Sequence, residues 1–193
     1  MEFQDVVRRR RMVRSFDGRP LPAAVMDRVL DNARRGPSAG FAQGVAFVAL
    51  EGPDQTAVFW DHTLPVEHRA GFRWGGLLRA PVLVVCLADR ETYVRRYGEP
   101  DKAGATWPVA WEEVDCAFAT MLLLLTAVDA GVGALFFGIP RGEAELLAAL
   151  GVPPGLRALG AVALGYPAAD DRPSTSAARR RRPATETIHR GRW

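Results

Sequence analysis

Residues 116–130 are apolar on nearly all sides, and this run constrains the fold more than any other part of the chain. It continues a pattern that begins at residue 112, and Gly131 follows as a C-terminal glycine, so we expect one long helix over 112–130. Two threonines and an aspartate interrupt the run, which is also too short for a membrane span of about 20 apolar residues. A helix without a polar face is buried all round. Because a chain of 193 residues rarely encloses one helix completely, we expect a second subunit to cover part of it.

Hydrophobic periodicity predicts further elements on both sides of this helix. Helices are expected over 2–10, 22–35, 53–60 and 140–150, and strands over 45–50, 82–88, 134–138 and 159–165. The strand at 45–50 is expected to be buried, and the apolar run at 82–88 is typical of a central strand covered on both faces. The aromatic segment 90–111 is expected to be irregular and to form a lid or a pocket wall. This order predicts an α+β or α/β fold in one domain over 1–193.

Several functional classes find no support in the sequence. No HExxH, GxSxG, phosphate-binding P-loop or GxGxxG motif is present, and no histidine has a metal ligand at suitable spacing. We therefore expect no metal site, and if the chain is an enzyme, a cofactor supplies the chemistry. Cys86 and Cys116 lie in apolar runs and are expected to be buried free thiols, which is typical of the cytoplasm. The charged N-terminus has no apolar segment after it, so we expect no signal peptide.

Two arginine runs lie near the ends of the chain. Five of the seven residues over 8–14 are arginine, and residues 179–182 are all arginine. Because guanidinium groups bind phosphate bidentately, we expect the fold to bring both runs onto one phosphate. A solvated charged surface and a nucleic-acid-binding surface are the alternatives. A net charge of +3 is too small to indicate nucleic acid by itself.

Four segments carry short motifs in a definite order. They are RRMVRSF at 10–16, PSAGFAQ at 37–43, GVGALFFG at 131–138, and LGYP followed by RRP within 164–193. They resemble the RRSxRxF opening, the PSAGNxQ loop, the GLG…G segment and the LGYP…RRP ending of the nitroreductase family of FMN-dependent oxidoreductases. Each motif is weak alone, but together they cover essentially the whole chain.

The resemblance implies an α+β nitroreductase-like fold, in which helices flank a central mixed or antiparallel sheet. It implies a homodimer with two FMN sites at the subunit interface, and a domain-swapped C-terminal tail, 168–193, that wraps around the partner subunit. The implied reaction is ping-pong: NADH or NADPH reduces the flavin, and an electron-poor small molecule such as a nitroaromatic or a quinone reoxidises it. Flavin N5 carries the chemistry, so no side chain is expected to be catalytic. Neither nucleic acid nor a membrane is expected as a partner.

The resemblance also implies which residues bind the cofactor. They are Arg10, Arg11, Met12, Arg14, Pro37, Ser38, Ala39, Phe41, Gln43, Phe137, Gly138, Arg179 and Arg181. The arginines would hold the phosphate, the 37–43 loop would lie along the flavin, and the backbone at 137–138 would face the ring edge. Met12 and Phe41 stand where the family has serine and asparagine, so a hydroxyl and an amide contact are expected to be absent.

Two further hypotheses concern the surroundings of the flavin. Aromatic residues that could shape the face above the ring are Trp74, Tyr97, Trp107 and Trp111, although each could equally be an ordinary core residue. The alternative to an enzyme is a non-catalytic protein that sequesters FMN or senses redox state. The replacement at Phe41 is its only support.

Overall fold

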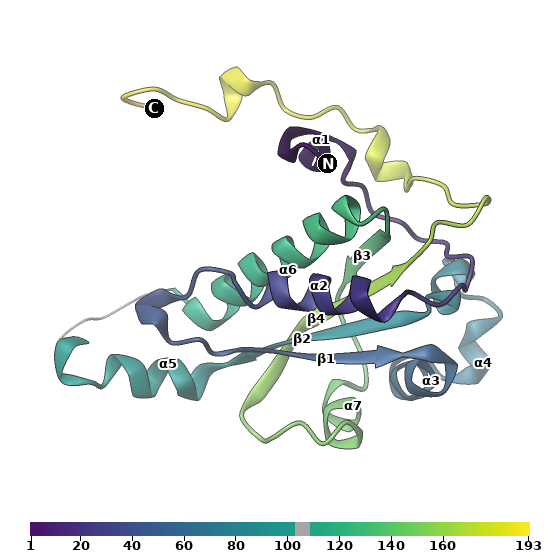
Figure 1. The fold of residues 1–193 in the computed structure, drawn as a ribbon, viewed down its shortest axis with the longest axis horizontal. Helices are drawn as coiled ribbons and strands as arrows, with labels where there is room; N and C mark the ends of the chain where they lie inside the picture. The colour runs from purple at the N-terminus through teal and green to yellow at the C-terminus, as the bar shows by residue number, and fades with distance from the viewer. Residues whose placement is uncertain (103–108) are drawn as a thin grey trace.

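The computed structural model describes residues 1–102 and 109–193. Its centre is a sheet of four strands in the order β1-β2-β4-β3, and every pairing is antiparallel. The strands are β1 (Val45–Glu51), β2 (Val82–Asp89), β3 (Gly133–Phe137) and β4 (Leu156–Gly165) (Figure 1). The predicted α+β class is confirmed, and the sheet is antiparallel rather than mixed.

Helices cover both faces of this sheet. They are α1 (Phe3–Arg9), α2 (Ala23–Ala33), α3 (Gly52–Thr63), α4 (Val66–Arg69), α5 (Arg90–Tyr97), α6 (Trp111–Asp129) and α7 (Glu143–Ala149). α2 and α6 lie on one face of the sheet, and α3 and α7 lie on the other (Figure 1). The predicted helices at 2–10, 22–35, 53–60, 112–130 and 140–150 are confirmed, with their ends shifted by a few residues.

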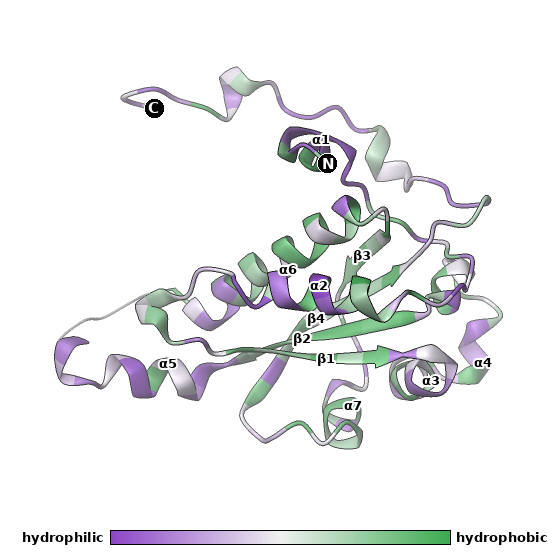
Figure 2. Ribbon diagram, viewed as in Figure 1, coloured by the Kyte–Doolittle hydropathy of each residue, from purple (hydrophilic) through white to green (hydrophobic). Residues whose placement is uncertain are grey.

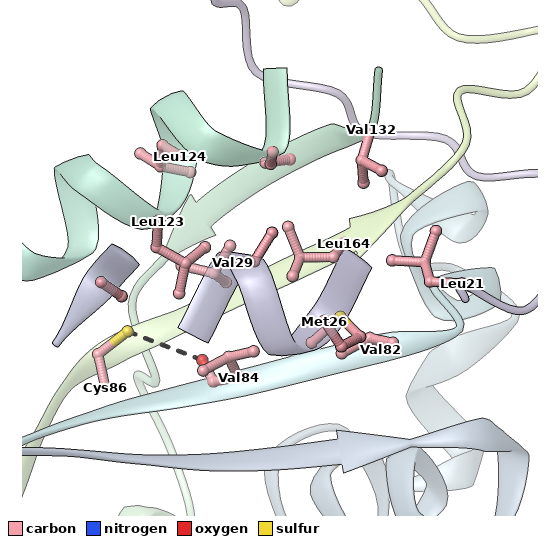
Figure 3. Close-up of a cluster of buried hydrophobic side chains, with 14 of the residues drawn as sticks. Leu21, Met26, Val29, Val82, Val84, Cys86, Leu123, Leu124, Val132 and Leu164 are labelled. Carbon is pink, nitrogen blue, oxygen red and sulfur yellow. Dashed lines mark hydrogen bonds between the residues drawn. The ribbon is translucent and has the colours of Figure 1, made fainter. Parts of the chain in front are cut away.

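β2 is the central strand that its apolar run predicted. Alternate side chains of a strand point to opposite faces, so β2 contributes to two cores. Val84 and Cys86 pack beneath α2 and α6, where Val29 and Leu123 point toward the sheet (Figure 3). Leu83, Val85 and Leu87 pack on the opposite face, against residues of α3 and α7. A strand enclosed in this way must be apolar at every position.

β1 was predicted to be buried, and this is wrong. β1 lies at the edge of the sheet, where only Leu50 is fully buried, while Ala46 and Glu51 are exposed. The short apolar run of an edge strand resembles that of a central one, because half of an edge strand still packs against the core. Within the described residues, the outer side of β1 has no neighbouring strand.

The prediction of an irregular segment at 90–111 is also partly wrong. Residues 90–97 form α5. The side chain of Asp89, just before the helix, accepts a hydrogen bond from the Thr92 N–H at 3.3 Å. This is an N-cap, and it satisfies a backbone donor of the first turn. Trp107, one of the aromatic candidates, lies outside the described residues.

Its own chain covers α6 on one side and leaves the other side exposed. Leu123 and Ala127 are fully buried, whereas Phe118 is 47 % exposed and Met121 is 45 % exposed. Figure 2 shows hydrophobic residues along much of α6 and hydrophilic ones along most of the C-terminal tail. The domain therefore fails to enclose this helix, as predicted. Its cover by a second subunit stays a prediction.

The C-terminal tail packs little on the rest of the chain. Every residue from Thr175 onward is exposed, including Ile188 and Trp193. The tail runs away from the sheet (Figure 1). Among the described helices, none combines the length and the hydrophobicity that a membrane crossing requires.

Both cysteines should resist modification in the native protein. Cys86 and Cys116 are free thiols and fully buried, as predicted, and burial raises the pKa of Cys86 to about 11 and that of Cys116 to about 12. Because the thiolate is the nucleophile, we expect neither to react with a disulfide reagent at about pH 8 unless the protein unfolds. Thiols counted with and without denaturant check this. Fast reaction of either one in the native protein would contradict it.

Candidate functional site

The N-terminal arginine motif, RRMVRSF at residues 10–16, runs along the outer edge of β3. α1 ends at Arg9, and the Arg10 N–H donates to Val6 O at 3.0 Å. The chain then forms a parallel bridge between Met12 and Ala134, and the Val13 N–H donates to Ala134 O at 2.9 Å. The edge of β3 therefore sets the place from which the arginine side chains project.

Arg11 is neutralised by a carboxylate from the far end of the chain. Its guanidinium pairs with Asp171, whose side chain is only 2 % exposed. The same carboxylate accepts the backbone N–H groups of Arg14 at 2.8 Å and of Ser15 at 3.0 Å. Asp171 thus links the arginine motif to the segment that follows β4, and it neutralises the charge of Arg11.

Arg10 and Arg14 carry no such partner. Within the described residues, no carboxylate forms an ion pair with either guanidinium. Arg14 Nη1 donates to Met12 O at 3.3 Å, and its guanidinium carbon lies 5.2 Å from the centre of the Trp74 ring. Of the three N-terminal arginines predicted near the phosphate, Arg10 and Arg14 are therefore half-buried cations available to an anion.

The contacts of Asp171 should make the free energy of unfolding depend on pH in the acidic range. Burial opposes its charge, but hydrogen bonds from Arg11, Arg14 and Ser15 hold its pKa below the ordinary value of 3.8. A carboxyl with a lowered folded pKa stabilises the protein above its unfolded pKa, and that stability is lost as pH falls through the folded pKa. We expect Asp171→Asn to lower the free energy of unfolding of the protein, without added ligand, by about 1–3 kcal/mol at neutral pH.

Urea titrations of Asp171→Asn and wild type between about pH 7 and pH 3 measure this effect. The difference between the two proteins should shrink below about pH 4, where the unfolded wild type binds its proton. Asp31→Asn, which removes an exposed carboxylate paired with Arg34 and Arg35, is the control and should change stability little. A constant difference across this range would mean that Asp171 does not titrate as described.

β3 ends beside open space. The Phe137 ring turns toward α3 and stacks on Trp60, with 6.0 Å between the ring centres. A Cβ built on Gly138 would meet no atom within 4 Å. Ala134, at the Met12 bridge, and Phe137 are three positions apart, a distance of about 10 Å along a strand. The backbone at 137–138 therefore remains approachable, at some distance from the arginine motif.

The 37–43 loop lies at the other end of α6. Its Ala39 N–H donates to Asp115 Oδ2 at 2.7 Å, near the start of α6. Pro37 and Gln43 are exposed, Ser38 is half-buried, and Phe41 is 76 % exposed. Within one chain, Phe41 therefore has no pocket to fill.

One subunit does not bring the two halves of the predicted site together. α1 packs on α6, and the N-terminal amine of Met1 pairs with Asp129 at its C-terminal end. Asp115 and Asp129 are 14 positions apart on α6, which is about 20 Å along the helix axis. The arginine motif and the 37–43 loop thus lie near opposite ends of one long helix.

The arginines of the tail are not bonded to the N-terminal run. Arg179 and Arg181 are exposed, and no hydrogen bond or ion pair within the described residues joins the two runs. Of the other aromatic candidates, Tyr97 lies beside the loop, 3.3 Å from a Cβ built on Gly40, and Trp111 is the first residue of α6. Among the described residues, no three histidine, cysteine or acidic side chains gather into a possible metal site.

Sequence analysis missed three residues that organise this region: Tyr93, Asp115 and Asp171. Asp115, near the start of α6, is 2 % exposed and accepts a hydrogen bond from the 37–43 loop. An acidic residue next to a long apolar run was the available signal. Nothing local marks Asp171, because its partners are more than 150 positions away.

A comparison with known families bears on this arrangement. The model of the nitroreductase family matches residues 7–166, from the arginine motif to the end of β4. The chain belongs to the nitroreductase family. The match ends before Asp171 and the tail, so the family pattern covers the sheet, its helices and both halves of the predicted site.

Individual members of the nitroreductase family agree over most of their length. A protein of Archaeoglobus fulgidus named "Putative NADH dehydrogenase/NAD(P)H nitroreductase" is 27% identical over 188 residues, covering 95% of this chain and 94% of that protein. A protein of the same name from Methanothermobacter thermautotrophicus is 24% identical over 172 residues, covering 87% and 78%. A crystal structure of a "putative nitroreductase in complex with fmn" from Desulfovibrio desulfuricans has a TM-score of 0.73 at 23% identity, covering 100% and 98%. This likeness confirms the predicted nitroreductase fold.

Proposed function

We propose that this protein is an FMN-dependent oxidoreductase that uses NADH or NADPH to reduce electron-poor acceptors such as nitroaromatics or quinones. Membership of the nitroreductase family supports flavin chemistry in general, and a structural relative was solved with FMN. The observation that carries the proposal is the pair Arg10 and Arg14. Both guanidinium groups lie beside the edge of β3 and have no carboxylate partner in the described part of the chain, so they suit a phosphate.

The residues of this chain fit FMN at both of its ends. Arg10 and Arg14 would hold the phosphate, while Arg11 stays with Asp171 and orients the motif. The open backbone at 137–138, about 10 Å along β3, would face the ring, where N–H groups stabilise negative charge. The chemistry that bound FMN would supply is hydride transfer from the nicotinamide and electron transfer to the acceptor. The protein would bind, orient and exclude water, without a catalytic side chain.

A homodimer completes this proposal. Because the arginine motif and the 37–43 loop lie about 20 Å apart on α6, one flavin could meet both only if two subunits contribute. The uncovered apolar surface of α6, including Phe118 and Met121, supports such an interface. The tail, 168–193, is exposed from Thr175 onward, and it would wrap around the partner and bring Arg179 and Arg181 to its surface. Two buried free thiols agree with the reducing cytoplasm that the sequence predicted.

A titration with FMN followed by a turnover assay tests the proposal. The protein should quench flavin fluorescence in a saturable manner and oxidise NADH or NADPH when a quinone is added. Binding without turnover would favour the non-catalytic alternative, a protein that sequesters FMN or senses redox state. Absence of FMN binding would overturn the proposal.

A further inference from the structure

The 37–43 loop has an unfavourable backbone conformation. Gly40, Phe41 and Gln43 all have positive φ, at 61°, 54° and 60°. Glycine adopts this region freely, but a bulky residue such as phenylalanine rarely does, since its Cβ crowds the backbone. Such residues keep this conformation only when surrounding contacts enforce it, and they gather at functional sites. The exposed side chain of Phe41 cannot supply those contacts.

A buried hydrogen-bond network behind the loop supplies the contacts that enforce this backbone conformation. Asp115 Oδ2 accepts the Tyr93 hydroxyl at 2.6 Å and the Ala39 N–H at 2.7 Å. The Ser38 hydroxyl lies 3.4 Å from the Tyr93 hydroxyl and accepts the Gln43 N–H at 2.8 Å. The network therefore joins α5 and α6 to both ends of the strained segment.

Burial makes this network hard to rearrange. Tyr93 is fully buried and Asp115 is 2 % exposed, and no cation pairs with Asp115 among the described residues. A buried carboxylate without a counter-ion depends on its hydrogen bonds, so each donor to Asp115 is needed. Burial, together with the bond to Asp115, raises the pKa of Tyr93, which keeps its hydroxyl a donor.

α5 also holds the loop by direct contact. A Cβ built on Gly44 would lie 2.5 Å from the Tyr93 ring, so only glycine fits where the loop passes Tyr93 into β1. Arg96 Nε donates to Gly40 O at 2.7 Å, and the same guanidinium pairs with Asp101. The loop is thus fixed at its centre and at both ends by side chains of two helices.

We propose that Tyr93 and Asp115 are positioning residues that hold the 37–43 loop in the conformation that binds the flavin. They act through the backbone of Ala39 and through Ser38, and need not touch the cofactor. The inference rests on the proposed function, because it takes this loop to contact FMN.

Three variants and one control test the proposal. Asp115→Ala removes the acceptor of the Ala39 N–H, Asp115→Asn keeps a carbonyl oxygen there, and Tyr93→Phe removes only the hydroxyl. Thr120→Val is the control, because its hydroxyl is also buried on α6 but donates to Cys116 O and not to the loop. Each protein is measured for hydrogen exchange over 37–44 without flavin, for thermal stability, and for FMN affinity.

Asp115→Ala and Tyr93→Phe should speed exchange over 37–44 and weaken FMN binding by about tenfold, the equivalent of one lost hydrogen bond. Asp115→Asn should recover part of the FMN affinity that Asp115→Ala loses. Thr120→Val should lower thermal stability by a similar amount to the other variants, but it should change neither the exchange over 37–44 nor the FMN affinity. Unchanged exchange, or faster exchange with unchanged affinity, would overturn the proposal. If Asp115→Ala does not fold, Tyr93→Phe decides.

The wild-type titration separates this inference from the proposed function. If wild type fails to bind FMN, the proposed function is wrong. If wild type binds and the Tyr93 and Asp115 variants bind equally well, only the positioning role is wrong.

Discussion

Phe118→Asp should convert the protein into monomers and weaken FMN binding by at least about 100-fold. Phe118 lies on the apolar surface of α6 that its own chain leaves uncovered, so a carboxylate there is solvated in the monomer. In a dimer interface of about 2,000 Å² or more, the same carboxylate would be buried without a partner. FMN binding should fall with assembly, because the arginine motif and the 37–43 loop would no longer meet.

Light scattering at micromolar concentration and flavin fluorescence measure the two effects together. Val66→Asp is the matched control, since it places the same charge at a position on α4 that is 68 % exposed. It should leave both mass and affinity unchanged. If wild type is monomeric and still binds FMN, the hypothesis that two subunits form the flavin site is wrong. It is also wrong if Phe118→Asp is monomeric and binds FMN as tightly as wild type.

Arg14→Ala should weaken FMN binding by at least about tenfold, because a hydrogen bond to a charged group contributes about 1.5–3 kcal/mol. Among the described residues, no carboxylate pairs with the half-buried guanidinium of Arg14, and its position over Trp74 limits its freedom. Arg11→Ala should affect affinity less and stability more, since Arg11 is committed to Asp171.

Fluorescence titration of the variants against FMN, beside urea unfolding without flavin, separates these two roles. Arg19→Ala, which removes an exposed guanidinium paired with Asp17, controls for the loss of one positive charge. Equal affinity in wild type and Arg14→Ala would show that the arginine motif is only a charged surface.

Local patterns predicted most of the elements because the information that specifies them is local. The unbroken apolar run of β2 indicates a strand covered on both faces, and the apolar girdle of α6 indicates a helix that one domain cannot enclose. The same reasoning failed for β1, because an edge strand and a central strand can have equally apolar sequences. It failed for α5, whose polar surface hides its periodicity and whose helix depends on the Asp89 cap and on the burial of Tyr93.

The sequence by itself determined the family and the cofactor class and predicted the segments that would carry the site, since these depend on motifs whose order is visible along the chain. Only the tertiary structure decided which of those residues are free to act. Asp171 reaches Arg11 and the backbone of Arg14 across more than 150 positions, and it removes one arginine from the set available to a phosphate. Asp115 meets Ala39 across 76 positions and fixes the loop at the end of α6 far from the arginine motif. Contacts between such distant positions arise from packing, and no local pattern encodes them.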